Sequence, residues 1–278
     1  MMVLPGGILR AGQRHQDCRL AAPNGRVALA LTDSLVATSS HPFWVSQTLL
    51  VILDELAGEA PCLADVEALS VADRQWLAIQ WRLHTAEQPE RPVWFSADCQ
   101  ACTARYDFSL RWQDVPLKPA AESYPYADVK LSLGQARFRV PDGLLQQQLA
   151  QTDRQDTRRC IAEALWVSLD GQPPPVHGDR DLSEADLDAI ESALEAVSPE
   201  LGLTLATRCP ECGSEQAVTI DPYSGLASPS HDLLADIHCL ASHYHWSEDA
   251  ILDLPDSRRR HYLKLIDRDL GQHGQGGH

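Results

Sequence analysis

Two Cys-x-x-Cys pairs, Cys99/Cys102 and Cys209/Cys212, are the residues whose types and spacing best suit chemistry in this chain. Structural zinc is commonly bound by four thiolates in a tetrahedron, and a Cys-x-x-Cys pair supplies two of them. The two pairs together therefore predict one shared four-cysteine site with zinc as the cofactor.

Alternating apolar residues approach each pair, as in Val93 and Phe95 before the first and Leu203 and Leu205 before the second. The alternation continues after each pair, which is typical of half-buried strands. Each pair is thus expected at the tip of a β-hairpin, in a turn called a knuckle below. Gly213 directly follows the second pair, where a tight turn favours glycine, so the first knuckle is expected to be the weaker one.

Two other interpretations of the cysteine pairs stay open. A redox dithiol is one, but thioredoxin-type motifs lie at the start of a helix, whereas strand-like patterns follow both pairs. A knuckle that has lost its metal is the other. The remaining cysteines are isolated, and Cys62 and Cys160 are expected to be small core residues.

Histidines and one further cysteine gather near the C-terminus, at His231, His238, Cys239, His243 and His245. A hydrolytic zinc site would need a pattern such as H-E-x-x-H or a general base beside it, and neither is present. Phosphate-binding glycine loops and the G-x-S-x-G elbow are also absent from the sequence. We therefore expect a protein that is not an enzyme.

Further matches between the two halves of the chain suggest an internal duplication. The segment 69–73 (LSVAD) resembles 182–186 (LSEAD), and 23–25 (PNG) resembles 141–143 (PDG). The predicted fold class is α+β: mainly helical, with two duplicated helix–β-hairpin (zinc-knuckle) repeats and a C-terminal helical segment. The predicted divisions are an N-terminal arm 1–19, repeat one 20–112, a connector 113–135, repeat two 136–226, a docking segment 227–270 and a disordered tail 271–278.

Local patterns predict helices and three of their capping residues. Ser46, Ser70 and Ser183 are expected N-caps, the last with Glu184 and Asp186 in the first helical turn. The predicted helices cover residues 26–39, 46–57, 70–84, 143–152, 155–168, 183–197 and 230–242, with two more after Ser247 and Pro255.

Charge and hydropathy limit the partners. The formal net charge is −16, which opposes binding to phosphate backbones, so no nucleic-acid partner is expected. The longest apolar run is short, and Pro5 to Gly7 interrupt the N-terminus, so neither a membrane span nor a signal peptide is expected. We expect a cytoplasmic protein with reduced thiols and no membrane partner.

The C-terminal segment combines aromatic and basic residues that suit a protein interface. The predicted partner-binding residues are Tyr244, His245, Trp246, Arg258, Arg259 and Arg260. An alternative interpretation is that Trp246 packs beneath its own short helix.

The stretch from Leu240 to Pro255, together with the Arg-Arg-Arg-His-Tyr-Leu run from Arg258, resembles segments of small tail proteins of contractile phages. Leu4-Pro-Gly-Gly, the helix at 69–77 and the Asp107-Phe-Ser-Leu run after the first knuckle resemble the T-even-type phage baseplate protein family.

The resemblance implies a non-enzymatic component or assembly factor of a contractile baseplate, with other baseplate or tail proteins as partners and a place in an assembled phage-like particle. The alternative function is a zinc-ribbon adaptor that binds nucleic acid or a polymerase-type complex, which the charge opposes. A zinc hydrolase built on the histidines is the third possibility, which the lack of catalytic geometry opposes.

Overall fold

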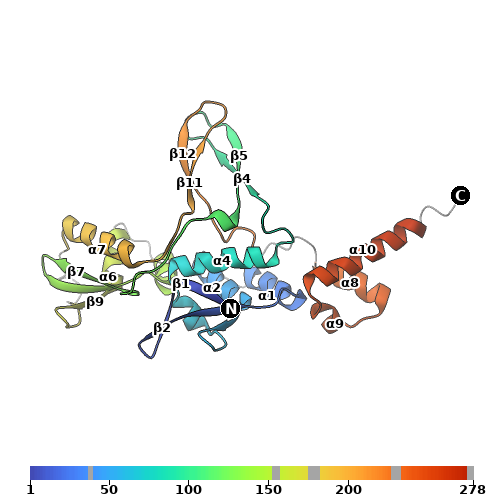
Figure 1. The fold of residues 1–278 in the computed structure, drawn as a ribbon, viewed down its shortest axis with the longest axis horizontal. Helices are drawn as coiled ribbons and strands as arrows, with labels where there is room; N and C mark the ends of the chain where they lie inside the picture. Colours follow the sequence, from blue (N-terminus) through green and yellow to red (C-terminus); the bar gives the residue numbers. More distant parts are fainter. Residues whose placement is uncertain (37–39, 152–156, 175–181, 227–232, 274–278) are drawn as a thin grey trace.

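A computed structural model describes residues 1–36, 40–151, 157–174, 182–226 and 233–273 of the protein. Helices and small antiparallel sheets alternate along the chain, so the fold is mixed α+β. Two bodies, each a sheet with helices, lie side by side. An arm of hairpins and a C-terminal group of helices project from them (Figure 1).

The first half opens with a three-stranded antiparallel sheet in the order β1-β2-β3. Helix α4 packs against β1, and α2 packs against α4. Its elements are β1 (Met2–Arg10), β2 (Gln13–Leu20), α1 (Gly25–Val36), α2 (His41–Ile52), β3 (Leu53–Leu56), α3 (Leu63–Glu67) and α4 (Val71–Thr85).

The second half has a similar order of elements around a second antiparallel sheet, β7-β8-β9, with α7 packed against β7. Turns with positive φ follow β3 at Ala57 and Gly58 and follow β9 at Asp170 and Gly171. Its elements are β7 (Tyr126–Leu131), β8 (Gly134–Arg139), α5 (Gly143–Ala150), α6 (Thr157–Leu165), β9 (Trp166–Leu169) and α7 (Glu184–Val197).

The prediction of a mainly helical chain built from helix–hairpin repeats is wrong, because each half begins with a hairpin and completes a three-stranded sheet. The strands β3 and β9 take the place of the last residues of the predicted helices 46–57 and 155–168. Each pairs with the hairpin before its helices: β3 with β2, and β9 with β8. Residues 2–20, predicted as an arm, form β1 and β2, and the connector 113–135 contains β6 and β7.

Two of the long helices, α4 and α7, begin at the serine N-caps that the sequence predicted. Ser70 accepts a hydrogen bond from the backbone N–H of Asp73, and Ser183 accepts one from that of Asp186. Ser46 is not an N-cap, because α2 begins five residues earlier and buries Ser46 inside the helix. There its hydroxyl donates to the carbonyl of Pro42, 3.2 Å away.

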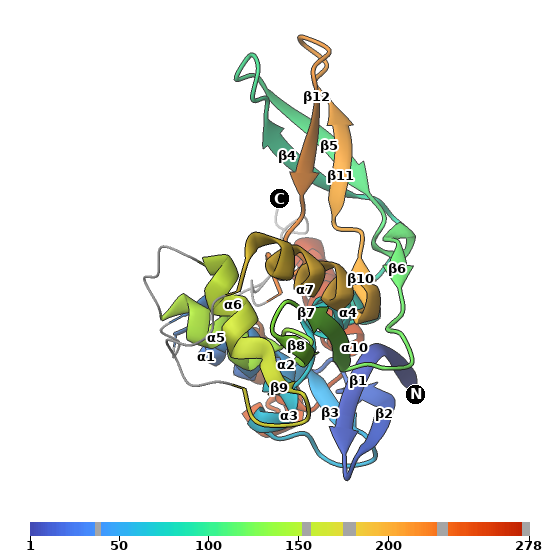
Figure 2. The same cartoon turned by 90° about the vertical axis from the view of Figure 1, so that its left-hand side faces the viewer.

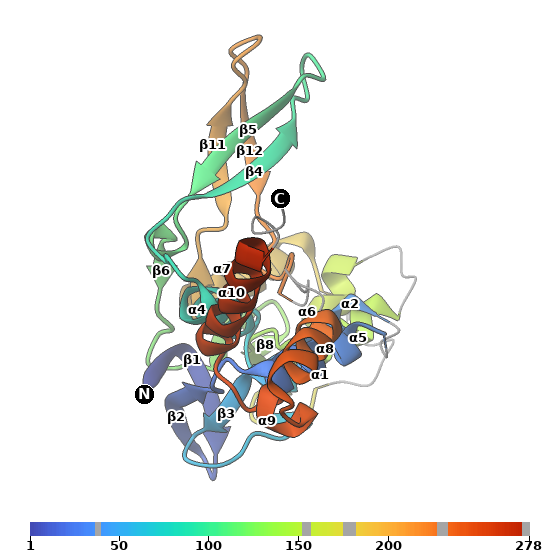
Figure 3. The ribbon, with the colours of Figure 1, turned by 90° about the vertical axis from the view of Figure 1, so that its right-hand side faces the viewer.

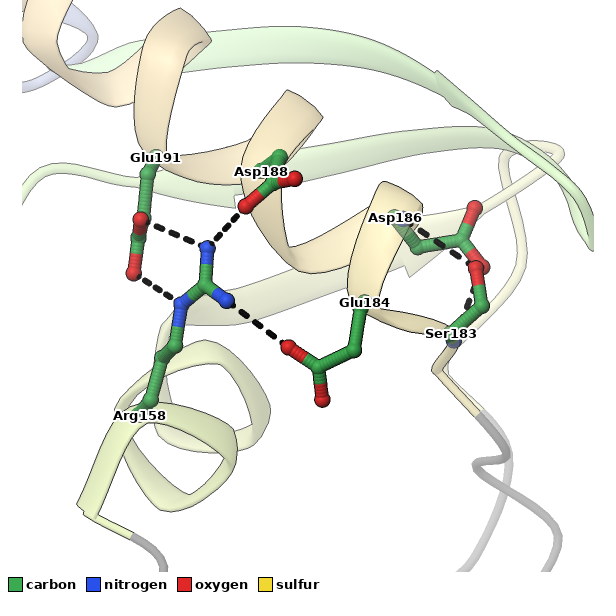
Figure 4. Close-up of polar contacts among 6 residues, drawn as sticks. All are labelled: Arg158, Ser183, Glu184, Asp186, Asp188 and Glu191. Atoms are coloured by element: carbon green, nitrogen blue, oxygen red, sulfur yellow. Dashed lines mark hydrogen bonds and ion pairs between the residues drawn. The ribbon is translucent and has the colours of Figure 1, made fainter.

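A cluster of ion pairs joins α6 to α7 (Figure 4). The guanidinium of Arg158 on α6 contacts three carboxylates of α7: Glu191 at 2.5 Å, Asp188 at 2.5 Å and Glu184 at 2.9 Å. The three acidic residues recur every three to four positions, so they share one face of the helix.

The guanidinium of Arg74 is buried where the first half meets α5 of the second. Arg74 is fully buried and donates to the carbonyl oxygens of Val66 (3.1 Å) and Pro42 (3.0 Å) and to the hydroxyl of Ser46 (3.0 Å). Burial lowers the pKa of Arg74. Gly143, the first residue of α5, lies against this guanidinium, and a Cβ there would stand 2.2 Å from Nη1.

The arm consists of two hairpins that form separate two-stranded sheets (Figure 2). They are β4 (Val93–Asp98) with β5 (Arg105–Leu110), and β11 (Thr204–Arg208) with β12 (Glu215–Thr219). The 3₁₀ helix η1 (Trp112–Asp114) follows β5. At the base, β6 (Leu117–Lys118) pairs with β10 (Glu200–Leu201), which places the two hairpins beside each other although about a hundred residues separate them.

The C-terminal helices form their own small core and dock on α1 (Figure 3). They are α8 (Leu233–Tyr244), α9 (Glu248–Leu252) and α10 (Asp256–His273). Ala28 and Leu29 of α1 pack against this core, and Arg26 forms ion pairs with Asp249 and Asp253.

Candidate metal centre

Both predicted knuckles adopt the same hydrogen-bonded turn at the end of a hairpin. In knuckle 1 (residues 99–104), the N–H of Cys99 donates to the carbonyl of Ala104, and the N–H of Thr103 donates to the carbonyl of Cys99, both at 2.9 Å. In knuckle 2 (residues 209–214), Cys209 and Ser214, and Gly213 and Cys209, repeat both bonds at 2.9 Å.

The fifth residue of each knuckle has a positive φ, 60° at Thr103 and 73° at Gly213. Glycine adopts this left-handed conformation without strain, whereas a β-branched threonine does not. Knuckle 1 is therefore the more strained turn, in the direction that the sequence predicted.

The four cysteine sulfurs lie together at the end of the arm, all within 4.8 Å of one another. Sγ of Cys99 is 3.6 Å from Sγ of Cys212, and Sγ of Cys102 is 3.7 Å from Sγ of Cys209. Zn–S bonds of about 2.3 Å in a tetrahedron place neighbouring sulfurs roughly 3.8 Å apart. A disulfide would need about 2.05 Å, and the four cysteines are free thiols. The spacing is that of ligands around one metal ion.

Both close sulfur contacts join the two knuckles. Each links the first cysteine of one knuckle to the second cysteine of the other. This reciprocal pattern is that of a two-fold arrangement, in which contact i to j implies contact j to i. Each hairpin thus supplies an equivalent half of the site.

Backbone amides favour the thiolate form of one ligand. The N–H groups of Cys102 and Ala101 point at the sulfur of Cys99 and lower the pKa of that thiol to about 6. The N–H of Ala104 similarly lowers the pKa of Cys102, but the thiols of Cys212 and Cys99 outweigh it and raise that pKa to about 12. Four neighbouring thiols do not all ionise together unless a cation balances their charge.

The first cysteine of each knuckle is buried and the second is exposed. Tyr106 and the partly buried Ala97 and Phe108 pack beneath Cys99 and Cys209. The sulfurs therefore sit on a small apolar floor, and both knuckles stand on hairpin strands rather than at the start of a helix. This placement does not match a thioredoxin-type dithiol.

A polar network under the sulfurs was not predicted from the sequence. The hydroxyl of Tyr106 lies 2.6 Å from that of Thr207, and the side-chain amide of Gln216 donates to Tyr106 at 2.7 Å. Tyr106 and Gln216 each follow the second cysteine of their knuckle by four residues. This equal spacing in the sequence could have indicated that the two side chains meet.

The predicted partner-binding residues are only partly available to a partner. Tyr244 and Trp246 stack with ring centroids 4.8 Å apart, and both contact Tyr262 of α10. Arg259 is buried and pairs with Asp256 and Asp236, whereas Arg260 pairs with Glu87. His245 and Arg258 are exposed. The half-buried Trp246 packs within the C-terminal core, with its ring against Tyr244 of α8 and Tyr262 of α10.

The remaining candidate ligands that the structure describes do not join a metal cluster. Within the part of the chain that the structure describes, the four cysteines are the single group of three or more metal-ligating side chains. His238, His243 and His245 are exposed, and His231 lies outside the described residues. Cys62 is exposed at the start of α3, so its assignment to the core is wrong.

Comparison with known proteins finds no matching family model and no similar curated protein or solved structure. Among the described residues, none of the helices has the length and apolar character that crossing a membrane requires.

Proposed function

We propose that this protein is a non-enzymatic structural component in which one zinc ion, bound by Cys99, Cys102, Cys209 and Cys212, joins its two hairpins into a single arm. The observation that carries the proposal is the convergence of four sulfurs from two knuckles, with inter-knuckle contacts of 3.6 and 3.7 Å. Four thiolates in a tetrahedron favour zinc among the common divalent ions.

The proposed ion has a structural role because four protein ligands leave no open position for substrate or water. Binding at such sites contributes on the order of 10 kcal/mol to folding, judged from zinc-finger peptides. Here it connects cysteines 107 positions apart, Cys102 and Cys209. Closing so long a loop costs the unfolded chain more entropy than closing a short one, which increases the benefit of the link.

Metal analysis tests the zinc site. Purified protein should contain one zinc per chain, and the double variant Cys99→Ser/Cys209→Ser should contain none. Cys62→Ser is the matched control, because Cys62 is an exposed cysteine outside the cluster and serine also caps a helix. A wild-type protein that carries iron, no metal or two zinc ions contradicts the proposal.

The finer assignment is to the baseplate of a contractile phage-like tail or injection system, as a component or assembly factor. Its support is the resemblance of the segments near Leu4, Leu69, Asp107 and Leu240 to baseplate and tail proteins. The projecting arm and the C-terminal helices give this acidic chain two separate places for contact with other subunits (Figure 1).

Co-purification tests that assignment. A tagged chain expressed in its own host should recover sheath, tube or other baseplate proteins of a contractile particle. The double variant Cys99→Ser/Cys209→Ser should recover less of them, whereas Cys62→Ser should recover the same amount. Recovery of none of these proteins by the zinc-loaded wild-type chain would reject the baseplate assignment while leaving the zinc site intact.

A further inference from the structure

Three polar side chains under the sulfurs form a closed circuit of hydrogen bonds between the hairpins. Thr207 donates to the carbonyl of Gln216, 3.2 Å away, so its hydroxyl accepts from Tyr106 at 2.6 Å. Tyr106 in turn accepts from the side-chain amide of Gln216 at 2.7 Å. Each hydroxyl therefore donates once and accepts once, and two of the three bonds cross from one hairpin to the other.

The side chain of Gln216 also holds knuckle 1 from outside it. Its Oε1 accepts from the N–H of Gln100 at 3.0 Å, and its Nε2 lies 3.3 Å from the carbonyl of Asp98. These two backbone groups flank Cys99. A residue of the second hairpin thus fixes the backbone on both sides of a cysteine in the first.

Tyr106 and Gln216 occupy equivalent positions in the two hairpins, four residues after the second cysteine of each knuckle. A direct contact between equivalent residues lies where the halves of a two-fold arrangement meet. Tyr106 is also buried, so its hydroxyl has a strong requirement for a partner. Neutral groups other than sulfur therefore also link the two knuckles.

We infer that Tyr106, Thr207 and Gln216 form a metal-independent latch that holds the two hairpins together and places the four sulfurs before an ion arrives. Without a cation the sulfurs link the hairpins only through thiol contacts at 3.6 and 3.7 Å, and a thiol is a weak hydrogen-bond donor and acceptor. Tyr106 and Gln216 are then positioning residues for the ion. The inference rests on the proposed zinc site where zinc affinity is measured, but not where disulfides are mapped in the metal-free chain.

Competition with a chelator of known affinity gives the first measurement. Tyr106→Phe removes the hydroxyl and keeps the ring, and Gln216→Leu keeps a side chain of similar bulk and removes both polar ends. Each variant should bind one zinc with an affinity lowered about 10- to 100-fold, the usual effect of losing a partner behind the metal ligands. Thr219→Val is the matched control, because it removes a 3.0 Å hydroxyl contact with Thr204 inside one hairpin. Its affinity should equal that of the wild type.

Disulfide mapping of the metal-free full-length chain gives the second measurement. Oxidised glutathione accepts two electrons from two protein thiols, which form one disulfide and release two glutathione molecules. A latched wild type should form Cys99–Cys212 and Cys102–Cys209. The two latch variants should shift toward Cys99–Cys102 and Cys209–Cys212, while Thr219→Val keeps the wild-type pattern.

Either measurement can overturn the latch. Unchanged zinc affinity in both variants rejects it, and so does a wild-type metal-free chain that pairs cysteines within each knuckle. The proposed function fails separately, when the wild-type protein binds no zinc, and the disulfide pattern still tests the latch in that case.

Discussion

Helices α4 and α7 each have an aspartate in the first turn, Asp73 and Asp186, but the two carboxylates lie in different surroundings. Asp73 of α4 is fully buried against the N–H groups of Gly6 and Gly7, and burial raises its pKa although these hydrogen bonds oppose the change. Asp186 of α7 accepts from the hydroxyl of Ser183 and from the N–H and hydroxyl of Ser132. These donors hold the pKa of Asp186 far below its ordinary value.

Replacement of Asp186 by Asn should lower the free energy of unfolding by about 1–3 kcal/mol at pH 7, because charge-assisted hydrogen bonds are lost. A carboxyl with a lowered folded-state pKa stabilises the fold above its unfolded pKa of about 3.9, and this stability is lost as the pH falls. The difference between wild type and Asp186→Asn should therefore narrow below about pH 5. Urea denaturation across pH measures it.

Glu195→Gln is the matched control, because Glu195 is exposed on the same helix. Its stability should stay within about 0.5 kcal/mol of the wild type throughout. A difference for Asp186→Asn that is constant from pH 7 to pH 3 would show that the charge of Asp186 is not the source of its contribution.

Replacement of Gly143 by Ala should destabilise the protein by about 1–3 kcal/mol, since the new methyl group would overlap the buried guanidinium of Arg74. Thermal and urea denaturation measure the change. Leu144→Ala is the control at the next position of the helix, where the side chain is 46% exposed and little is lost. Equal stability of the two variants would mean that the Arg74 contact is not tight.

At the scale of elements, local sequence patterns were enough to predict those helices and strands whose conformation depends on nearby residues. The strands around both knuckles follow from alternation, and the caps at Ser70 and Ser183 follow from serine placed three residues before aspartate. The sequence also predicted that the cysteines converge, because a structural zinc site needs four ligands and each Cys-x-x-Cys pair supplies only two.

Elements that depend on distant partners could not be predicted from local patterns. Strands β3 and β9 have four residues each, too few to show a period, and both continue directly from a helix. Their pairing with β2 and β8 decides their conformation. The burial of Arg74 could not be predicted either, because its partners are two carbonyl oxygens and one hydroxyl from two other helices, α2 and α3.

The C-terminal helices are an appended element, and their removal tests this directly. Deletion of residues 228–278 should leave one zinc per chain, since α8 to α10 have a core of their own and contact the rest mainly through α1. The melting temperature should fall by several degrees, because Ala28 and Leu29 become exposed. Metal analysis and calorimetry measure both results.

Arg26→Ala is the control for that deletion, because it removes only the exposed ion pairs with Asp249 and Asp253. Its melting temperature should differ little from that of the wild type, since exposed ion pairs contribute little. Loss of the metal on deletion of 228–278 would place the C-terminal helices in the structural core.

At the scale of the whole molecule, the arm turns the chain into a ring. The chain leaves the first half through hairpin β4–β5, forms the second half, and returns through hairpin β11–β12. Strands β6 and β10 close the ring at its base, and the four cysteines close it at its far end. Strands β5 and β11 run between the two closures, and the entire second half lies inside both of them, after β6 and before β10 in the chain.

A ring of this kind has a mechanical consequence. Tension applied to the two ends of the chain passes from Cys102 to Cys209 through the metal and bypasses the intervening chain, since the two cysteines are 107 positions apart. In single-molecule stretching, the first half should extend first, and a further gain of about 350–390 Å should appear only when the metal site ruptures. With chelator present, that late step should move to lower force. If the second half extends before the metal site ruptures, tension reaches it by another route and the metal does not carry the load.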